Sequence, residues 1–234
     1  MMLCIDAGNT RLKCGLHDGQ AWRMQQAFSY GAPDEVAAAL PALPARIIAC
    51  NVAGPEARRQ IEQLAVRLAV PLTWLESSAV RCGVRNAYDQ PAQLGADRWA
   101  ALIATRALHA EPAVVVLAGT ATTIDLLDGD GLFRGGLILP GLTLMRQTLA
   151  SNTAGLPQAN GQFRQWPTNT HDAITSGAVQ ATLGAIERMR ASLKSGACCI
   201  VSGGAAAELV PHLAAPVRPI DHLVLEGLRC AASC

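Results

Sequence analysis

The stretch LCIDAGNTRLK, residues 3–13, decides the fold of this chain. A short apolar run ends in the acid Asp6, and the turn at residues 8–10 leads toward Lys13. Apolar residues that stop at a Gly-Asn-Thr turn predict a β-hairpin whose tip exposes backbone N–H groups and hydroxyls. Because glycine lets an anion approach the main chain closely, such a tip suits phosphate. An ordinary hairpin, with an acid that caps its neighbours, is the alternative.

The segments around this hairpin predict a first half of three strands, a helix, a strand, a helix and a strand. The second of these helices is amphipathic, with Ile61, Leu64 and Leu68 on one face. The expected strands cover about residues 2–6, 11–17, 21–28, 46–52 and 71–75, and the helices begin after Pro33 and at Gly54.

A similar order of elements is expected again after a loop near residues 77–92 and a helix near 94–109. The run 113–141 predicts three strands, and its second turn, Asp-Gly-Asp-Gly, has the residues that a tight hairpin needs. Further helices are expected near residues 141–150, 170–194 and 222–232 and after residue 204, with strands near 197–204 and 217–220.

The two halves open with related segments, CIDAGNTRLKCGL at 4–16 and VVLAGTATTIDLL at 115–127. Gly8 and Gly119 occupy equivalent positions, each where a strand ends and the chain reverses. Two independent hairpins have no structural need to share these residues. An internal duplication is therefore the simplest explanation.

The duplication predicts an α/β protein with an N-terminal half, 1–110, a C-terminal half, 111–234, and a cleft between them. Two phosphate-binding tips in one chain indicate a single nucleotide whose phosphates are held from both sides. Lys13 would add a positive charge, and Asp6 would hold Mg²⁺ through water.

Composition excludes several classes of function. Charged residues make up 16% of the chain and the net charge is +1, so no nucleic-acid partner is indicated and a small substrate is expected. No apolar run reaches the ~20 residues of a membrane span. Eight cysteines without a signal-peptide pattern or a zinc-ligand spacing predict a cytosolic compartment. Cys198 with Cys199, or Cys230 with Cys234, could form redox pairs, but inert thiols are expected.

A series of motifs spans nearly the whole chain and resembles the type III pantothenate kinase family. Each motif alone is weakly specific, whereas their order and spacing are highly specific. The motifs are DAGNTRLK (6–13), YDQPAQLGADRWAA (88–101), GTATTIDLL (119–127), GGLILPGLTLM (135–145), NTAGLP (152–157), NTHDAITSGAV (169–179), VSGGAAAEL (201–209) and IDHLVLEGL (220–228).

The resemblance implies the fold of the acetate and sugar kinase, Hsp70 and actin superfamily, with two ribonuclease H-like halves. It implies ATP-dependent phosphorylation of pantothenate, the first committed step toward coenzyme A. It also implies a homodimer with active sites near the subunit interface, and a need for Mg²⁺ and a monovalent cation, K⁺ or NH₄⁺.

The resemblance also assigns residues. The first phosphate motif is matched by Asp6, Gly8, Asn9, Thr10 and Lys13, the second by Gly119, Thr120 and Thr122, and the substrate motif by Tyr88, Gly95, Ala96, Asp97 and Arg98. Asp97 is implied to be the general base for the pantothenate hydroxyl. Thr170 matches a position that reaches pantothenate from the neighbouring subunit. Gly203 and Gly204 match the region that holds the base and sugar of the nucleotide.

The residue types Asp97 and Arg98 suit this role physically. Phosphoryl transfer needs an acceptor hydroxyl held in line and a carboxylate that takes its proton late. Arginine can pair in a forked geometry with the carboxylate of an anionic substrate. The alternative is a helix-start acid with an arginine in a surface salt bridge.

One position departs from the family pattern. The second motif of the family usually begins with an aspartate associated with the monovalent cation, and this chain has Leu117 there. The cation site is then lost with activity retained, or another acid such as Asp125 compensates, or the chain binds ligands without efficient turnover. The competing functions are a regulatory or ligand-binding protein and a kinase for another small anionic acceptor.

Overall fold

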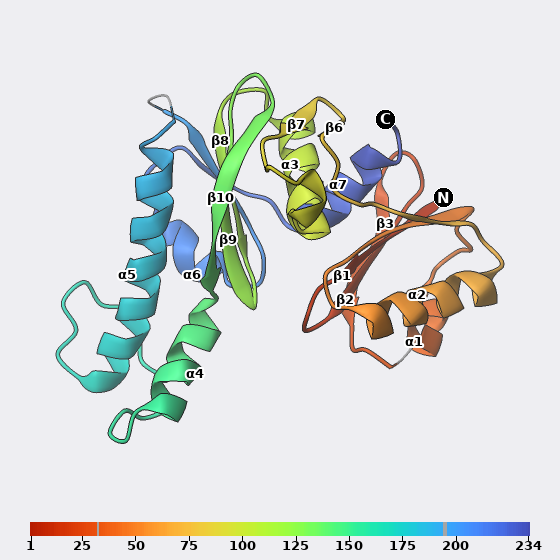
Figure 1. The fold of residues 1–234 in the computed structure, drawn as a ribbon. Coiled ribbons are helices and arrows are strands. Elements are labelled where there is room, and N and C mark those ends of the chain that lie inside the picture. Colours follow the sequence, from red (N-terminus) through yellow and green to blue (C-terminus); the bar gives the residue numbers. More distant parts are fainter. Residues whose placement is uncertain (32, 194–195) are drawn as a thin grey trace. The chain divides into compact units, whose positions relative to one another are not determined.

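The computed structural model describes residues 1–31, 33–193 and 196–234, which fold as two compact α/β units (Figure 1). Unit 1 contains Met1–Ala110, Gly131–Phe133 and His222–Cys234, and unit 2 contains Glu111–Asp130 and Arg134–Asp221. Among the described residues, no helix has the length and apolar character that crossing a membrane requires.

Unit 1 begins with β1 (Met2–Ala7), β2 (Leu12–His17), β3 (Trp22–Phe28), α1 (Pro33–Ala39), β4 (Arg46–Asn51), α2 (Pro55–Leu68) and β5 (Leu72–Trp74). Its five-stranded sheet has the order β3-β2-β1-β4-β5. The central strand β1 pairs antiparallel with β2, through the predicted hairpin, and parallel with β4. Because parallel neighbours need a crossover, β3 and α1 carry the chain from β2 to β4.

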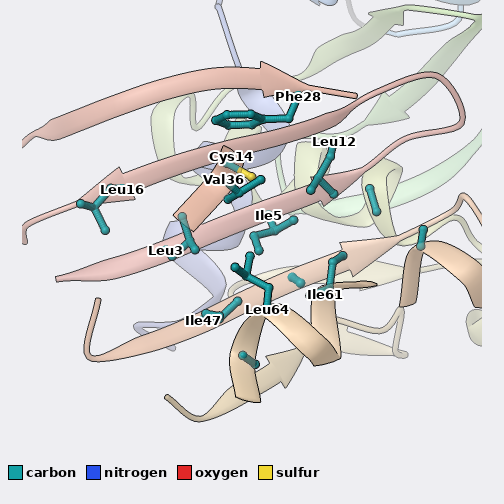
Figure 2. Close-up of a cluster of buried hydrophobic side chains, with 14 residues drawn as sticks. Leu3, Ile5, Leu12, Cys14, Leu16, Phe28, Val36, Ile47, Ile61 and Leu64 are labelled. Carbon is teal, nitrogen blue, oxygen red and sulfur yellow. The ribbon is translucent and has the colours of Figure 1, made fainter. Parts of the chain in front are cut away.

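Side chains on β1 alternate between two environments. Leu3 and Ile5 belong to an apolar core that also contains Ile61 and Leu64 of α2 (Figure 2). The predicted amphipathic face of α2 is therefore the face that is buried. Asp6, one residue on from Ile5, points to the other face of the sheet.

Two further helices of unit 1, α3 (Ala96–Leu108) and α7 (Leu223–Ala231), pack on each other. A Cβ atom at Gly227 would clash with the carbonyl group of Ala100, so the two helix backbones touch there. The sequence prediction placed residues 222–234 in the C-terminal half, and this assignment is wrong. The apolar face of α7, which includes Leu225 and Leu228, is buried in unit 1, where α7 packs on α3 and β1.

The segment 77–92 contains a hairpin where the sequence predicts only a loop. β6 (Val80–Arg81) pairs antiparallel with β7 (Val84–Asn86), and the 3-10 turn η1 (Pro91–Gln93) follows. β7 also pairs in parallel with Leu132–Phe133, the first residues of β10 (Leu132–Pro140). Strands of two and three residues are too short to show a period in the sequence.

Cys82, in the turn of this hairpin, forms a disulfide with Cys234. The expectation of an inert thiol is therefore wrong for Cys234, and the alternative pairing of Cys230 with Cys234 is wrong too. No local spacing relates the bonded cysteines, because 152 residues separate them. Of the six free cysteines, five are buried, and each of these lies in a strand: Cys4, Cys14, Cys50, Cys198 and Cys199.

Unit 2 contains β8 (Ala113–Ala118), β9 (Ala121–Leu127), the rest of β10, α4 (Leu142–Asn152), α5 (Thr170–Arg190), β11 (Cys198–Ser202), α6 (Ala206–Leu209), η2 (Val210–His212) and β12 (Val217–Pro219). These strands have the order β12-β11-β8-β9-β10. The central strand β8 pairs antiparallel with β9 and parallel with β11, as β1 pairs with β2 and β4. The predicted duplication is thus confirmed by the topology.

Helix α5 covers one face of this sheet. Val179, Leu183 and Ile186 of α5 share a core with Val114 and Val116 of β8. The helix ends at Arg190, before the predicted end at residue 194, which lies outside the described residues.

Candidate active site

Asp6, near the carboxyl end of β1, is 3% exposed and lies opposite Lys13 of β2. The Lys13 Nζ atom is 3.4 Å from Oδ2 of Asp6. Burial raises the pKa of Asp6, while the charge of Lys13 and hydrogen bonds from Lys13 and Cys50 act in the opposite direction. Strand pairing therefore brings together the acid and the base of the first predicted phosphate motif.

The tip between β1 and β2 leaves space beside its backbone. Asn9 and Thr10 are exposed, and the Gly8 carbonyl accepts a hydrogen bond of 2.6 Å from the Tyr30 hydroxyl. A Cβ atom at Gly8 would meet no atom of the chain closer than 3.7 Å, so the packing of the chain does not itself demand glycine there. Open space beside a main-chain N–H is what an incoming phosphate needs.

The carboxyl end of β4 lies next to that of β1, with Cys50 opposite Asp6 in parallel register. The Cys50 Sγ–H donates a hydrogen bond of 3.7 Å to Oδ1 of Asp6. The side chain of Asn51 holds the turn that leads to α2, since it accepts from Ala53 N–H at 2.9 Å and donates to the Gly54 carbonyl at 2.8 Å.

Asp97 lies in the first turn of α3, and its Oδ1 atom accepts a hydrogen bond of 2.8 Å from the backbone N–H of Arg98. A Cβ atom at Gly95 would be 2.7 Å from this oxygen and 3.8 Å from a methyl group of Val52, so glycine leaves room for the carboxylate. Burial raises the pKa of Cys50, and the charges of Asp6 and Asp97 raise it further. Both carboxylates therefore lie within electrostatic reach of one thiol.

The Arg98 side chain is held among aromatic rings and is not on the surface. It is 3% exposed, and Nη1 donates a hydrogen bond of 3.0 Å to the Tyr88 hydroxyl. Its guanidinium carbon is 5.7 Å from the Tyr88 ring centre and 5.9 Å from that of Phe133. The alternative of a surface salt bridge is wrong for Arg98. An arginine stacked in this way has a fixed orientation and retains its full charge.

Three turns meet at the carboxyl ends of β8 and β11 in unit 2. Gly141 N–H donates to the Thr120 carbonyl at 2.9 Å, and Ala205 N–H donates to the Ala118 carbonyl at 3.0 Å. A side chain at Gly141 would clash with the carbonyl groups of residues 119 and 120. The glycine at this position therefore lets the turn that bears Gly119 and Thr120 pack against the start of α4.

Gly203 makes a second close approach to this turn. Its φ is +104°, a conformation that disfavours side chains, and a Cβ atom there would clash with the Ala118 carbonyl. The Gly203–Gly204 segment, which the resemblance assigns to the nucleotide base and sugar, thus lies beside the second predicted phosphate turn. Open α/β sheets bind ligands at the carboxyl ends of their strands.

Thr122 and Leu117 are less exposed than Gly119 and Thr120 at the tip of the turn. Thr122 is 0% exposed, and its hydroxyl has no hydrogen-bond partner among the described residues. Leu117 is half-buried and lies opposite Thr123. Asp125 is 1% exposed and lies opposite Val115, so it shares a sheet face with Leu117 but lies two residues farther from the turn.

Thr170 begins α5 in unit 2, whereas the other predicted substrate residues belong to unit 1. It lines a pocket of about 910 Å³ between α4 and α5, together with Met145, Leu149 and Ile174. Asn169 caps the helix by accepting a hydrogen bond of 2.9 Å from Asp172 N–H.

Two residues of the site were not predicted from the sequence. Cys50, which bonds to Asp6, was interpreted only as a strand thiol, and Phe133, which stacks on Arg98, received no role. The apolar context of Cys50 and Phe133 gives no signal for a polar site. In the described part of the chain no three His, Cys, Asp or Glu side chains form a metal-ligand group.

The duplicated topology and the glycine hairpin that opens each unit define the sugar kinase and actin-like ATPase fold. A solved structure described as a conserved putative Baf family transcriptional activator from Campylobacter jejuni has a TM-score of 0.69 at 20% identity, covering 99% of this chain and 97% of that one. A putative 2-dehydro-3-deoxygalactonokinase from Sinorhizobium meliloti has a TM-score of 0.61 at 17% identity, covering 100% and 97%. These likenesses concern the fold alone.

A family model described as type III pantothenate kinase matches residues 2–192. The type III pantothenate kinase of Aromatoleum aromaticum is 49% identical, covering 99% of this chain and 98% of that protein. The one from Dechloromonas aromatica is 45% identical, with 98% of each covered. The chain belongs to the type III pantothenate kinase family.

Proposed function

We propose that this kinase transfers the γ-phosphoryl group of ATP to the hydroxyl of pantothenate, forming 4′-phosphopantothenate, the first step of coenzyme A synthesis. Asp97 is the general base and Arg98 binds the pantothenate carboxylate. The observation that carries this proposal is the arrangement at the start of α3, where Asp97 in the first turn is followed by a buried arginine stacked on Tyr88 and Phe133.

Asp97 acts by geometry more than by basicity. Its first-turn position and the bond from Arg98 N–H fix the carboxylate, which receives the substrate proton. In a loose phosphoryl-transfer transition state the proton leaves late, so a weak base in the right place suffices. The fixed guanidinium of Arg98 adds selectivity for an anionic acceptor.

The residues assigned to the phosphates of ATP are, in unit 1, Gly8, Asn9, Thr10 and Lys13 and, in unit 2, Gly119 and Thr120. Exposed main-chain groups and the space beside Gly8 support this assignment. Thr122 is buried, so its side chain does not contact phosphate. Its role is to pair with Ala118 at the base of the turn.

Asp6 fits Mg²⁺ as a single acid that acts through water, because the described residues supply no cluster of three acids for direct ligation. Mg²⁺ would neutralise the charge that develops on the phosphates. The position of Leu117 does not fit a monovalent cation, since a hydrocarbon side chain offers no ligand. The enzyme is therefore expected to turn over without needing K⁺ or NH₄⁺.

A homodimer is proposed through exposed apolar side chains of unit 2. Ile138 is 65% exposed and Trp166 82% exposed, and Leu144 and Leu149 are exposed on α4. Exposed apolar side chains of this size mark contact surfaces. Sedimentation equilibrium should give twice the mass of the chain, and Leu144→Lys should shift the measured mass toward that of the monomer.

We also propose a cytoplasmic location for the enzyme.

The decisive experiment is ADP release with and without pantothenate, in the wild type and in Asp97→Asn. We expect pantothenate-dependent release by the wild type and a loss of about 10²–10⁴-fold in kcat for the variant. Binding of pantothenate, measured by calorimetry, should persist in the variant. Leu117 favours one alternative function, that of a ligand-binding protein. This alternative is supported if pantothenate binds but ADP release stays at background under all Mg²⁺ and cation conditions.

A further inference from the structure

The disulfide Cys82–Cys234 lies within unit 1 and joins the turn between β6 and β7 to the last residue of the sequence. We propose that this pair is a reversible redox brace, which orders the β6–β7 hairpin and thereby strengthens pantothenate binding at Arg98. The brace depends on the proposed role of Arg98 as the ligand of the pantothenate carboxylate.

The backbone of Cys82 is the first observation. Cys82 has a φ of +49° and Gly83 a φ of +77°, so both central residues of this tight hairpin turn are left-handed. Glycine, asparagine and aspartate favour that conformation, and cysteine does not. Local backbone preference therefore does not explain Cys82. An unfavourable backbone position kept in a native turn points to a role for its side chain.

The second observation is what the hairpin holds. Asn86, the last residue of β7, donates its N–H to the Ala79 carbonyl at 2.9 Å, and its Oδ1 atom accepts a hydrogen bond of 3.0 Å from Tyr88 N–H. Tyr88 in turn accepts the hydrogen bond from Arg98. The hairpin thus leads directly into the ring and hydroxyl that orient the guanidinium.

The other end of the brace is fixed on α3, the helix that begins with Asp97 and Arg98. α7 packs against α3 with its Gly227 on the backbone of Ala100, and Cys234 follows α7. Apart from the disulfide, the hairpin is held by a bond of 2.9 Å from Arg81 to the Ala231 carbonyl, by the short pairing of β7 with β10 and by the buried side chain of Val84. These contacts hold the strands, whereas the disulfide holds the turn, so larger motion of the turn at Cys82 and Gly83 is expected when the disulfide breaks.

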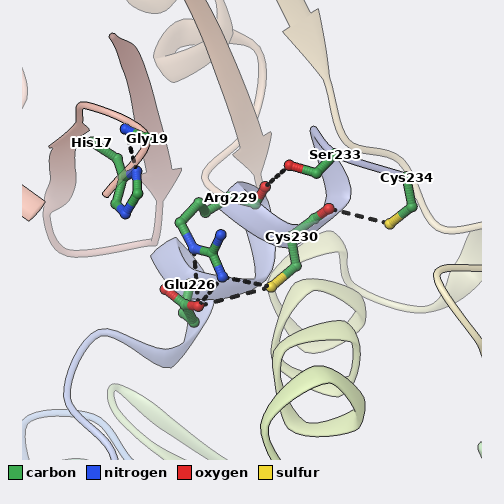
Figure 3. A network of polar contacts seen from close by, with 7 residues as sticks. All are labelled: His17, Gly19, Glu226, Arg229, Cys230, Ser233 and Cys234. Carbon is green, nitrogen blue, oxygen red and sulfur yellow. Dashed lines mark hydrogen bonds and ion pairs between the residues drawn. The ribbon is translucent and has the colours of Figure 1, made fainter. Parts of the chain in front are cut away.

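Access to the disulfide is the third observation. Cys234 is exposed and Cys82 half-buried, whereas the free cysteines other than Cys230 are buried. The Sγ atom of Cys230 contacts the side chains of Glu226 and Arg229 (Figure 3). Cys234 Sγ contacts the backbone carbonyl of Cys230 and not its Sγ atom. Burial also raises the pKa of Cys230, which disfavours its thiolate. Cys234 is the exposed member of the disulfide, so an external thiol can reach the S–S bond there.

The redox step is ordinary thiol–disulfide exchange with glutathione. A glutathione thiolate attacks Sγ of Cys234, the S–S bond breaks, and Cys82 leaves as a thiolate that takes up a proton. A second glutathione thiolate attacks the mixed disulfide and releases the Cys234 thiol with glutathione disulfide. Glutathione disulfide drives the reverse reaction, in which the pair loses two electrons and two protons.

The test compares the full chain in buffers of reduced glutathione and of glutathione disulfide. Peptide mass mapping should find Cys82 linked to Cys234 in the oxidised buffer and free in the reduced one. Amide exchange over residues 79–88 should be slower in the oxidised form, and the KM for pantothenate should be about three- to tenfold lower with kcat unchanged within about twofold. The proposal is overturned if the link does not form, or if exchange and KM are the same in both states.

Two variants separate the brace from other effects. Cys82→Asn suits the left-handed turn and should behave as the reduced form in both buffers. Cys230→Ser should respond to redox as the wild type does. If neither form releases ADP, the proposed function fails, and the brace is then judged by exchange over residues 79–88 and by calorimetric pantothenate binding. The proposed brace is wrong if amide exchange and pantothenate affinity are the same in the oxidised and the reduced form.

Discussion

The thiol of Cys50 lies 3.7 Å from Oδ1 of Asp6, on the neighbouring strand and in register with it. Lys13 approaches the other oxygen, Oδ2, at 3.4 Å. The carboxylate is therefore oriented by one partner on each side, although it is almost fully buried. The charge of Asp97 also raises the pKa of the Cys50 thiol, so this side chain is bonded to one acid of the proposed reaction and lies within electrostatic reach of the other.

Replacing Cys50 by alanine should impair the use of Mg²⁺. The change removes a weak donor to Asp6, and a hydrogen bond to a charged group contributes about 1 kcal/mol or more. We expect the Mg²⁺ concentration for half-maximal rate to rise about fivefold, with pantothenate KM unchanged. Cys50→Ser keeps a donor and should retain near wild-type Mg²⁺ dependence. Equal behaviour of the two variants would show that the thiol only fills space.

Asp6→Asn should stabilise the ligand-free protein at neutral pH while it removes Mg²⁺-dependent turnover. Burial raises the folded-state pKa of Asp6. A raised pKa favours the protonated form, so the contribution of Asp6 to stability is full below its unfolded pKa and is lost as pH rises through the folded pKa. The asparagine side chain does not ionise, so the variant does not lose this stability as the pH rises. Melting temperatures at pH 5 and pH 8 should show the variant gaining about 2–4 °C over the wild type at the higher pH only.

Arg98→Lys should raise the KM for pantothenate by about 10–100-fold, because lysine loses both the forked pairing and the stacking on Tyr88 and Phe133. The matched control is the substrate: pantothenyl alcohol has a hydroxyl in place of the carboxylate. With that substrate the wild type and the variant should have similar KM values. A loss of the same size with both substrates would mean that Arg98 is structural. Tyr88→Phe should give a smaller effect, since the ring remains.

The sequence was sufficient for the parts of the molecule that repeat or that have a period. The hairpin at residues 8–10, the amphipathic α2 and the duplicated strand order all follow from local patterns, and the structure agrees with them. Contacts between distant segments could not be predicted. The stacking of Phe133 on Arg98, the bond of Cys82 to Cys234 and the packing of α7 on α3 each depend on long-range pairing.

Leu117→Asp should give this enzyme a dependence on a monovalent cation. Leu117 is half-buried at the end of β8 and lies opposite Thr123, so a carboxylate there need not be fully desolvated. An acid at this place supplies the oxygen ligand that leucine lacks, and a cation would then offset its charge beside the phosphate turn. ADP release by the variant should rise several-fold on adding K⁺ or NH₄⁺ and stay low with a bulky organic cation, while the wild type responds little. Leu117→Asn, of the same shape but without charge, is the control and should stay insensitive. A wild type that already requires K⁺ would instead point to Asp125, on the same sheet face, and Asp125→Asn should then abolish that requirement.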